Sequence, residues 1–547
     1  MSISDHTLIL VQLLTSLFFI RSNRCNFYAT AIPQRANEPW SVILCKFADT
    51  AKYEPQTREW YQKWMTGSGA GTIAKYFMDV SNGIYTITNT EVLGWMTLPW
   101  TIQQVKLMAL MDETLWKDDN ISTLFFVKAK QLCVEFAARK TKLNKRKITI
   151  LNAEHGAMYG KENGVLITPR LSFNSVLAHE MVHSFHIGHS YSDRKIKIFP
   201  NARMGEYDDH YDLMSTANAR MYKSRYGFSG PGLNGPHLDY LGWLPSNRIL
   251  YFGRDGRSSS MIRLSSLSIP HAWTKDWLLV MVPFDRNNPA NVFTLEFRTP
   301  VNYDSGIMQE AIIIHKVDLK GTNYYSTIVT HRKDYDEMMV GTEWVHFLEQ
   351  DSPEIYPAIK LRVERIDRQR QIAILLINST FSPVKNCFYN KVNFKNTFSG
   401  DLNTKTQRHL TNDTNETKQN SLSNGTHLRC EQKRLGEIHV KAKLFSFFKD
   451  LLTFGMNACH DGYVWRTIDP YDYVCITKER KQQIQNQRKA RNRLRICRKP
   501  LVPRKAFPSD HVCVTQKEFA ITQQENAESH KNMKYHLFFN GEETIAL

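Results

Sequence analysis

The chain has 547 residues, of which 42% are hydrophobic and 12% aromatic, a composition typical of a globular protein. This length is too great for one hydrophobic core, so we expect two to four domains. Lysine and arginine exceed the acidic residues by 71 to 53, which gives a formal charge of +18 and favours anionic partners.

An apolar run near the start, TLILVQLLTSLFFI, covers residues 7–20. A helix needs about 17–25 apolar residues to span a bilayer, so this run is short for a membrane anchor. It predicts a secretory signal peptide over residues 1–24, with an uncleaved anchor as the alternative. The remaining sequence predicts no stable membrane span.

Strand and helix patterns alternate between residues 36 and 245. Short apolar runs rich in β-forming residues predict strands, and apolar side chains spaced by three and four predict helices. The expected order is strand 40–48, helix 70–80, strand 83–88 ending near the Gly94–Trp95 turn, helix 122–138, strands 147–151 and 164–168, and helix 172–185. Such alternation favours a mixed α/β fold.

The last of these helices carries the sequence HEMVHSFHIGHS, residues 179–190. His179 and His183 are four residues apart, so a helix stacks both imidazoles on one face, with Glu180 beside them. Two imidazoles so placed can bind one zinc ion, while the carboxylate acts on a metal-bound water. If the helix ends just after His183, then His189 can supply a third ligand and leave one position open for water.

Two alternatives remain for this motif. If the helix continues, His186 lies on the same face and replaces His189 as the third ligand. The histidines can also be ordinary buried residues whose ring nitrogens are satisfied by hydrogen bonds. In a chain with 19 histidines, H-E-x-x-H with further histidines nearby is rare by chance, which favours metal binding.

The motif also resembles a known signature. Metzincins carry H-E-x-x-H-x-x-G-x-x-H followed by a methionine turn, and this chain has His186 at the glycine position. Over about residues 40–245 the chain resembles the gametolysin family of secreted zinc endopeptidases, and more loosely beyond. The segments that carry the resemblance are WSVILCKFAD, YFMDVSNGIYTI, VLGWMTLP, AHEMVHSFHIGHS, YDLMS and GLNGPHLDYLGWL.

The resemblance implies an α+β metzincin-like catalytic domain over residues 36–245. The residues with implied roles are the zinc ligands His179, His183 and His189, the general base Glu180 and the turn methionine Met214. Histidine is among the few residues other than glycine that are enriched at positive φ, so His186 can still end the helix. The acidic residues around Met214, at 208, 209 and 212, are expected in a solvated loop, with a calcium site as the less favoured alternative.

Residues 246–380 contain short β-rich runs between turns, namely DWLLVMVPF, NVFTLEF, EAIIIHKV and RQIAILLI. They predict a β-sandwich-like domain, which either shapes a substrate cleft or is purely structural. Residues 381–456 are expected to form a polar, glycosylated linker, because residues 390–428 are rich in Asn, Thr, Ser and Lys.

Sequons and cysteines indicate an extracellular location. The N-x-S/T sequons are at Asn120, Asn378, Asn412, Asn415 and Asn424. Most of the nine cysteines should pair in an oxidising compartment, with Cys25 as the candidate for the unpaired one. The sequence leaves open the partners of Cys45, Cys133, Cys387 and Cys430.

Residues 457–547 contain an internal repeat with a period of 38 residues. CHDGYVWRTIDPYDYVCIT (459–477) matches CRKPLVPRKAFPSDHVCVT (497–515), and Arg466/Arg504 and Asp472/Asp510 coincide. Each unit spaces its cysteines by 16 residues, so we expect two tandem cysteine modules with the disulfides Cys459–Cys475 and Cys497–Cys513.

A basic run lies between and within these repeats. Residues 478–505 hold 12 basic residues and one acidic residue, Glu479. The run either binds anionic matrix or polysaccharide, or is a solvated helix face. No nucleic-acid partner is expected.

Together these patterns predict a secreted zinc-dependent endopeptidase that hydrolyses extracellular or matrix glycoproteins. The alternative, from another class, is a catalytically inactive metallopeptidase-like protein that binds matrix or mediates adhesion. The intact Glu180 and ligand histidines count against this alternative, because loss of catalytic residues would be its simplest sign.

Overall fold

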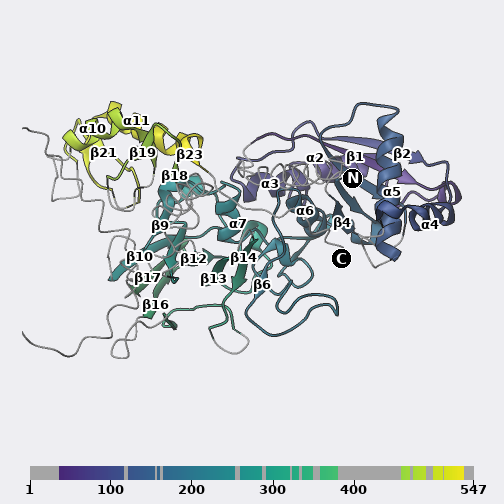
Figure 1. Ribbon diagram of the computed structural model, residues 1–547. Coiled ribbons are helices and arrows are strands. Elements are labelled where there is room, and N and C mark those ends of the chain that lie inside the picture. Colours follow the sequence, from purple (N-terminus) through teal and green to yellow (C-terminus); the bar gives the residue numbers. More distant parts are fainter. Residues whose placement is uncertain are drawn as a thin grey trace, which may run out of the picture.

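The structure is a computed structural model. It describes residues 36–115, 121–153, 157–160, 164–252, 259–285, 291–320, 323–331, 335–348, 358–379, 458–468, 472, 474–487, 497–508 and 510–534. The expected signal peptide and linker, the sequons at 120, 412, 415 and 424, and the cysteines at 25, 387 and 430 lie outside these residues. Figure 1 shows a helix-flanked sheet in purple and blue beside a β-rich part in teal and green, with a yellow-green tail next to the latter.

A five-stranded sheet forms the centre of the first part, in the order β2-β1-β3-β5-β4. Its strands are β1 (Trp40–Lys46), β2 (Glu91–Thr97), β3 (Arg146–Leu151), β4 (Ala157–Gly160) and β5 (Gly164–Ile167). All pairings are parallel except that of β4, which runs antiparallel to β5 at the edge. The apolar run of β1 is continuous because the strand is buried on both faces.

Helices cover both faces of this sheet. On one face lie α2 (Arg58–Thr66), α3 (Ile73–Val80) and α6 (Asn174–His183), in one apolar cluster with Val42 and Leu44. On the other lie α4 (Ile102–Met111) and α5 (Ile121–Ala138), in a second cluster with Ile43. A disulfide between Cys45 and Cys133 joins β1 to α5 on this second face.

The expected helices 70–80 and 122–138 are present as α3 and α5, whereas α2 and α4 were not predicted. The expected strand at 83–88 is wrong, because this segment forms turns with one isolated bridge from Thr86 to Asn37. Its apolar residues alternate because Tyr85 and Ile87 are both buried in the core, although the segment does not pair as a strand. The strand follows as β2, so Gly94 and Trp95 lie inside it and not in a turn.

The described residues of the β-rich part form two sheets. A six-stranded sheet has the order β6-β14-β13-β12-β11-β9, and a four-stranded sheet has the order β10-β17-β16-β15. Their strands are β6 (Tyr191–Ser192), β9 (Ile249–Tyr251), β10 (Ser259–Ser265), β11 (Leu279–Pro283), β12 (Val292–Arg298), β13 (Ala311–Lys320), β14 (Asn323–Ile328), β15 (Glu343–Phe347), β16 (Ala358–Asp367) and β17 (Ile372–Ser379). The sheets meet through Phe293 and Trp344, whose ring centroids are 4.9 Å apart.

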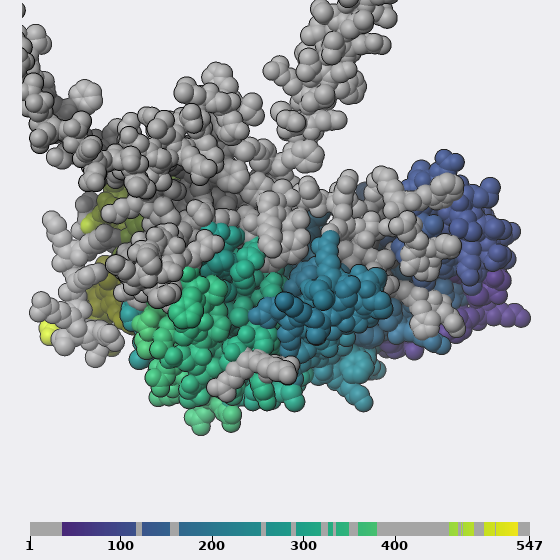
Figure 2. Space-filling view, turned by 60° about the horizontal axis from the view of Figure 1, so that its bottom comes forward, coloured from purple at the N-terminus to yellow at the C-terminus, as the bar shows by residue number. Residues whose placement is uncertain are grey.

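The β-rich part is continuous with the segment that follows α6. Strand β6 lies only two residues after His189, yet it pairs with β14 of the six-stranded sheet. One apolar cluster extends from the five-stranded sheet into both β-rich sheets. In Figure 2 the blue-teal residues lie directly against the green ones. A domain boundary at residue 245 therefore stays a prediction.

Shorter elements connect these sheets. Strands β7 (Tyr222–Ser224) and β8 (Gly227–Ser229) form a ribbon, followed by helix α7 (Gly235–Tyr240). The 3-10 helices are η1 (Ala48–Thr50), η2 (Glu113–Leu115), η3 (Pro169–Leu171), η4 (Leu213–Ser215), η5 (Ser246–Arg248), η6 (His271–Trp273), η7 (Asn302–Asp304) and η9 (Ser529–Asn532). In the part of the chain that the structure describes, no helix is long and apolar enough to cross a bilayer.

The described residues of the tail form three short ribbons, two α-helices and the 3-10 helix η9. Its elements are β18 (Ala458–Cys459), β19 (Tyr463–Trp465), β20 (Cys475–Thr477), α10 (Lys478–Gln487), β21 (Val502–Pro503), β22 (Cys513–Val514), α11 (Gln516–Glu528) and β23 (Met533–Lys534). The structure contains the disulfides Cys459–Cys475 and Cys497–Cys513. The repeated Arg and Asp positions form equivalent buried ion pairs, Arg466–Asp472 and Arg504–Asp510, each with a closest distance of 2.8 Å.

We expect the Cys45–Cys133 disulfide to stabilise the five-stranded sheet. Replacing both cysteines by alanine should lower the free energy of unfolding of this part by roughly 2–5 kcal/mol, because the cross-link restricts the unfolded chain. Hydrogen exchange of the β1 and α5 amides, compared with the Cys497→Ala/Cys513→Ala control in the tail, measures this effect. Unchanged exchange in β1 and α5 would contradict the prediction.

Candidate metal centre

Helix α6 carries the first two histidines of the site and ends at His183, two residues earlier than the sequence suggested. All ten of its residues are buried, because the helix lies between the five-stranded sheet and the segment around η4. The rings of His179 and His183 lie side by side, with centroids 4.6 Å apart, as the spacing of four residues predicts.

The chain turns sharply after α6. The backbone N–H of His186 donates to the carbonyl of His183 at 2.9 Å, and His186 adopts a φ of +64° with its side chain exposed. This left-handed residue reverses the chain, so His189 returns to the same side as the helix histidines. One ring nitrogen each from His179, His183 and His189 lies within 4.8 Å of the other two. His186 is not part of this cluster.

Each imidazole of the cluster is oriented by a hydrogen bond from its Nδ1 atom. The acceptors are the carbonyl of Leu213 for His179 at 3.0 Å, the carbonyl of Ile187 for His183 at 2.8 Å, and Oε1 of Glu206 for His189 at 2.8 Å. Carbonyl and carboxylate oxygens only accept, so Nδ1 carries the proton and Nε2 keeps its lone pair. Metal-ligating histidines are typically held in this way.

The three Nε2 atoms are buried and have no hydrogen-bond partner among the described residues. Burial lowers the pKa of His179 and of His183 to about 3, and that of His189 to about 4. The imidazoles are therefore neutral near pH 7, as metal ligation requires. Unpartnered buried nitrogens are costly unless they bind something, so this set fits a metal ion.

Glu180 lies on α6 beside these histidines and is buried. Its Oε2 atom has no hydrogen-bond partner within the described part of the chain. Burial raises the pKa of the Glu180 carboxyl to about 8, and the nearby charge of Lys130 opposes this shift. Lys130 is itself buried and donates from Nζ to the carbonyl of Gly164 at 3.0 Å. One oxygen of Glu180 thus remains available for a proton or a water molecule.

Met214 lies in η4, the turn that follows the histidine motif, and is fully buried. The carbonyl of its neighbour Leu213 orients His179, so the turn directly supports the cluster. Asp212 locks this turn in place. Its carboxylate accepts hydrogen bonds from the hydroxyl of Ser190 at 2.7 Å and from the backbone N–H of Asn234 at 3.0 Å.

The acidic residues near Met214 are not solvated, contrary to expectation. Asp208, Asp209 and Asp212 are all buried. Asp208 pairs with Arg194 at 2.8 Å, and Asp209 pairs with His315 of the six-stranded sheet at 2.9 Å. A run of acids looks like a surface loop when its partners lie elsewhere in the chain, which explains the error.

The sequence did not single out Glu206 as part of the site. Besides accepting from His189, its carboxylate accepts from the backbone N–H of Arg203 through Oε2 at 2.7 Å. Its neighbour Tyr207 adopts a φ of +62°. The centroid of the Tyr207 ring lies 3.9 Å from the centroid of the His189 ring. Glu206 lies at no fixed spacing from the histidine motif at 179–190. A search for short sequence patterns therefore could not identify it.

Comparison of the chain with models of known protein families, with curated proteins and with solved structures gave no match. The interpretation of the site therefore depends on its geometry. Three neutral imidazoles suit zinc, copper, iron and nickel, so the cluster can hold a metal ion without specifying which.

We predict that His189→Ala removes most of the metal affinity, because two imidazoles hold an ion far less tightly than three. His186→Gly is the matched control and should bind metal like the wild type, since glycine tolerates the positive φ at this position. Metal stoichiometry after gel filtration measures both. Loss of metal from His186→Gly with retention in His189→Ala would contradict the assignment.

Glu206→Gln should weaken metal binding by roughly 10–100-fold, because the carboxylate fixes the orientation of His189 and increases its basicity. Titration against a competing chelator gives the affinity. Glu91→Gln, an exposed position on β2, serves as the control for loss of one negative charge. Equal metal affinities of wild type and Glu206→Gln would show that Glu206 has no positioning role.

Proposed function

We propose that this protein is a zinc-dependent endopeptidase that hydrolyses extracellular proteins or glycoproteins. The observation that carries the proposal is the convergence of one ring nitrogen each from His179, His183 and His189, on a helix that also carries the buried Glu180. Structural zinc sites have four protein ligands, whereas catalytic sites have three and leave a position for water. The order of these residues, with Met214 in a buried turn, resembles the metzincins and the gametolysin family.

A zinc ion bound there would lower the pKa of a bound water and polarise the scissile carbonyl group. In its ionised form Glu180 acts as the general base, since its Oε2 has no partner among the described residues and can accept the proton of the attacking water. The same carboxyl then donates that proton to the leaving amine. Hydrogen bonds to Leu213, Ile187 and Glu206 keep the imidazoles oriented throughout.

An extracellular location is part of the proposal. Three disulfides are typical of proteins from oxidising compartments. The apolar run at 7–20 supports secretion because it is typical of a signal peptide. Asn378, the one described sequon asparagine, lies on β17 and is partly exposed, so a glycan there is compatible with the fold.

Binding to anionic matrix through the basic run is a further part of the proposal. Within the described residues of this run, Arg480 pairs with Glu518 and Glu525, and Arg504 pairs with Asp510. These two arginines are engaged inside the tail, whereas Lys478, Arg498, Lys499 and Lys505 of the same run are exposed and remain candidates for matrix binding. The inactive, adhesive alternative gains no support from the site, where Glu180 is retained.

The test is Glu180→Gln, which keeps the size of the side chain but removes the base. Because Glu180 is not a ligand, the variant should bind one metal ion per chain like the wild type. Its rate of cleavage of a general protein substrate should fall by roughly 10²–10⁴-fold, the usual contribution of general acid–base catalysis. Metal analysis and a proteolysis assay on the same preparation give both results.

Removal of the metal provides the control. A zinc chelator should abolish wild-type proteolysis, and added zinc should restore it. A Glu180→Gln variant that cleaves at the wild-type rate would contradict the proposed role. A wild-type protein that binds zinc tightly but cleaves no protein substrate would favour the inactive alternative.

A further inference from the structure

A second candidate site lies away from the metal centre. It is a cavity of about 720 Å³ between the turn after α3, the segment that follows α7, the 3-10 helix η6, and the end of the tail at η9. Pockets for small ligands typically have volumes of about 300–1,000 Å³, so this one has a suitable size. None of the histidines of the metal centre lines it.

The walls of the cavity are held by hydrogen bonds between segments far apart in the sequence. Oδ1 of Asn82, after α3, accepts from the backbone N–H of His271 in η6 at 2.7 Å. The hydroxyl of Ser246 donates to that of Ser529 in η9 at 2.8 Å. Arg248 donates to the carbonyl of His271 at 2.7 Å. These contacts fix the shape of the cavity.

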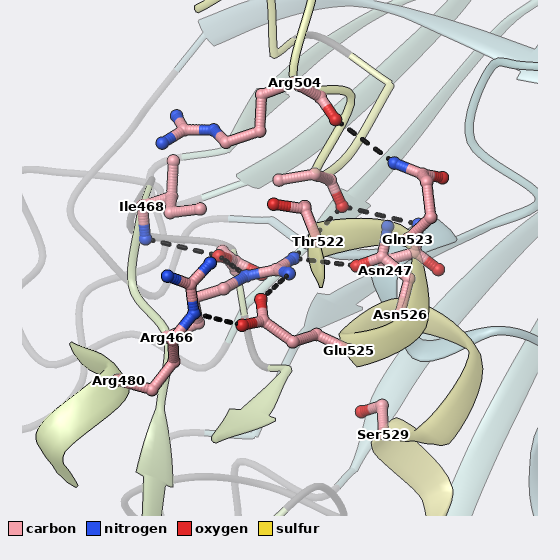
Figure 3. A network of polar contacts seen from close by, with 12 residues as sticks. Asn247, Arg466, Ile468, Arg480, Arg504, Thr522, Gln523, Glu525, Asn526 and Ser529 are labelled. Carbon is pink, nitrogen blue, oxygen red and sulfur yellow. Dashed lines mark hydrogen bonds and ion pairs between the residues drawn. The ribbon is translucent and has the colours of Figure 1, made fainter. Parts of the chain in front are cut away.

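The tail supplies one wall, and a polar network fixes its position. In Figure 3, Arg466 is close to Glu525 and Asn526 of α11, and Ser529 follows on the same side of the helix. Arg466 donates to Oδ1 of Asn526 at 2.9 Å and to the carbonyl of Ala506 at 3.1 Å. Outside the tail, the amide of Asn247 donates to the same Ala506 carbonyl at 3.4 Å. The wall is thus tied both to the tail and to the β-rich part.

Asp239 is the unusual residue of this cavity. It is only 8% exposed, and its carboxyl makes no hydrogen bond or ion pair with any residue that the structure describes. Burial raises its pKa to about 7, with no neighbouring charge to oppose the shift. A carboxylate that lines a cavity and has no partner among the described residues can form a strong hydrogen bond with a charged donor. The carboxylate of Asp239 is therefore suited to a ligand that carries a cationic hydrogen-bond donor.

The rest of the lining favours a cation with an apolar body. No lysine or arginine is among the described residues that line the cavity, although the chain as a whole carries an excess of positive charge. Its other carboxylate, Asp79, already pairs with Lys75. Burial lowers the pKa of His271 to about 3, so this imidazole is neutral. Trp243 and Ile249 contribute apolar wall.

We propose that this cavity binds a small amphipathic cation, namely a protonated amine on an apolar body, whose ammonium group pairs with the carboxylate of Asp239. The amine can belong to a free small molecule or to a lysine side chain of another protein. This site is separate from the metal centre, so the proposal does not depend on the proposed peptidase activity.

Calorimetric titration of the full-length protein at pH 8, where the carboxyl of Asp239 is mostly ionised, tests the proposal. The probes are 2-phenylethylamine, its uncharged analogue 2-phenylethanol, and a lysine blocked at both its α-amino and carboxyl groups. We expect the amine to bind at least about tenfold more tightly than the alcohol, because only the amine forms a charge-assisted hydrogen bond. Tighter binding of the blocked lysine than of the free amine would identify a protein side chain as the source.

Two variants test the role of the carboxylate. Asp239→Asn should remove the preference for amine over alcohol, while the control Asp79→Asn should keep it, because Asp79 is already paired. Ala272→Trp, at an exposed position on the cavity lining, should weaken both probes by narrowing the cavity without touching the carboxylate. Equal binding of amine and alcohol to the wild type, no binding of either amine at millimolar concentration, or an unchanged preference in Asp239→Asn would overturn the proposal.

Discussion

The ion pair between Asp209 and His315 fixes the segment on which the metal centre depends. Oδ2 of Asp209 and Nε2 of His315 are 2.9 Å apart, and both side chains are fully buried. Burial alone would lower the pKa of His315, but Asp209 and Glu296 outweigh it and raise that pKa. Both pKa shifts, the raised one of His315 and the lowered one of Asp209, favour the ionised pair, and loss of one partner of a buried ion pair typically costs about 3–5 kcal/mol.

This ion pair matters because of its position in the chain. Asp209 lies between Glu206, which orients His189, and Leu213, which orients His179. Anchoring Asp209 to β13 therefore anchors two of the three hydrogen bonds that direct the imidazoles. Strand β12 adds a second anchor, because the buried guanidinium of Arg298 donates to the carbonyl of Tyr211 at 3.0 Å. The β-rich part thus fixes the position of the segment that orients the histidines of the metal centre.

The sequence predicted features that depend on local spacing. The spacing of four residues from His179 to His183 was enough to place both rings on one face, and the tolerance of histidine for positive φ allowed the turn at His186. It could not predict Glu206 or the partners of Asp209, since His315 is 106 residues away and no local pattern links the two. The prediction of a strand at 83–88 was wrong for a related reason. An alternating apolar pattern indicates which side chains are buried, but it does not show whether the backbone pairs with another strand.

The tail shows how the same residues can act in both local and long-range contacts. Arg466 and Arg504 occupy equivalent positions of the two repeats, and each pairs with an aspartate six residues later. Each pair compensates two buried charges in a small module that has little apolar core, and the two disulfides stabilise these modules. Both arginines also contact α11: the side chain of Arg466 reaches Glu525 and Asn526, and the backbone carbonyl of Arg504 accepts from Nε2 of Gln523 at 3.1 Å. Both repeats therefore hold the helix that borders the cavity. The high positive charge of this region therefore serves internal structure in part, and net charge alone overstates what it offers to an external partner.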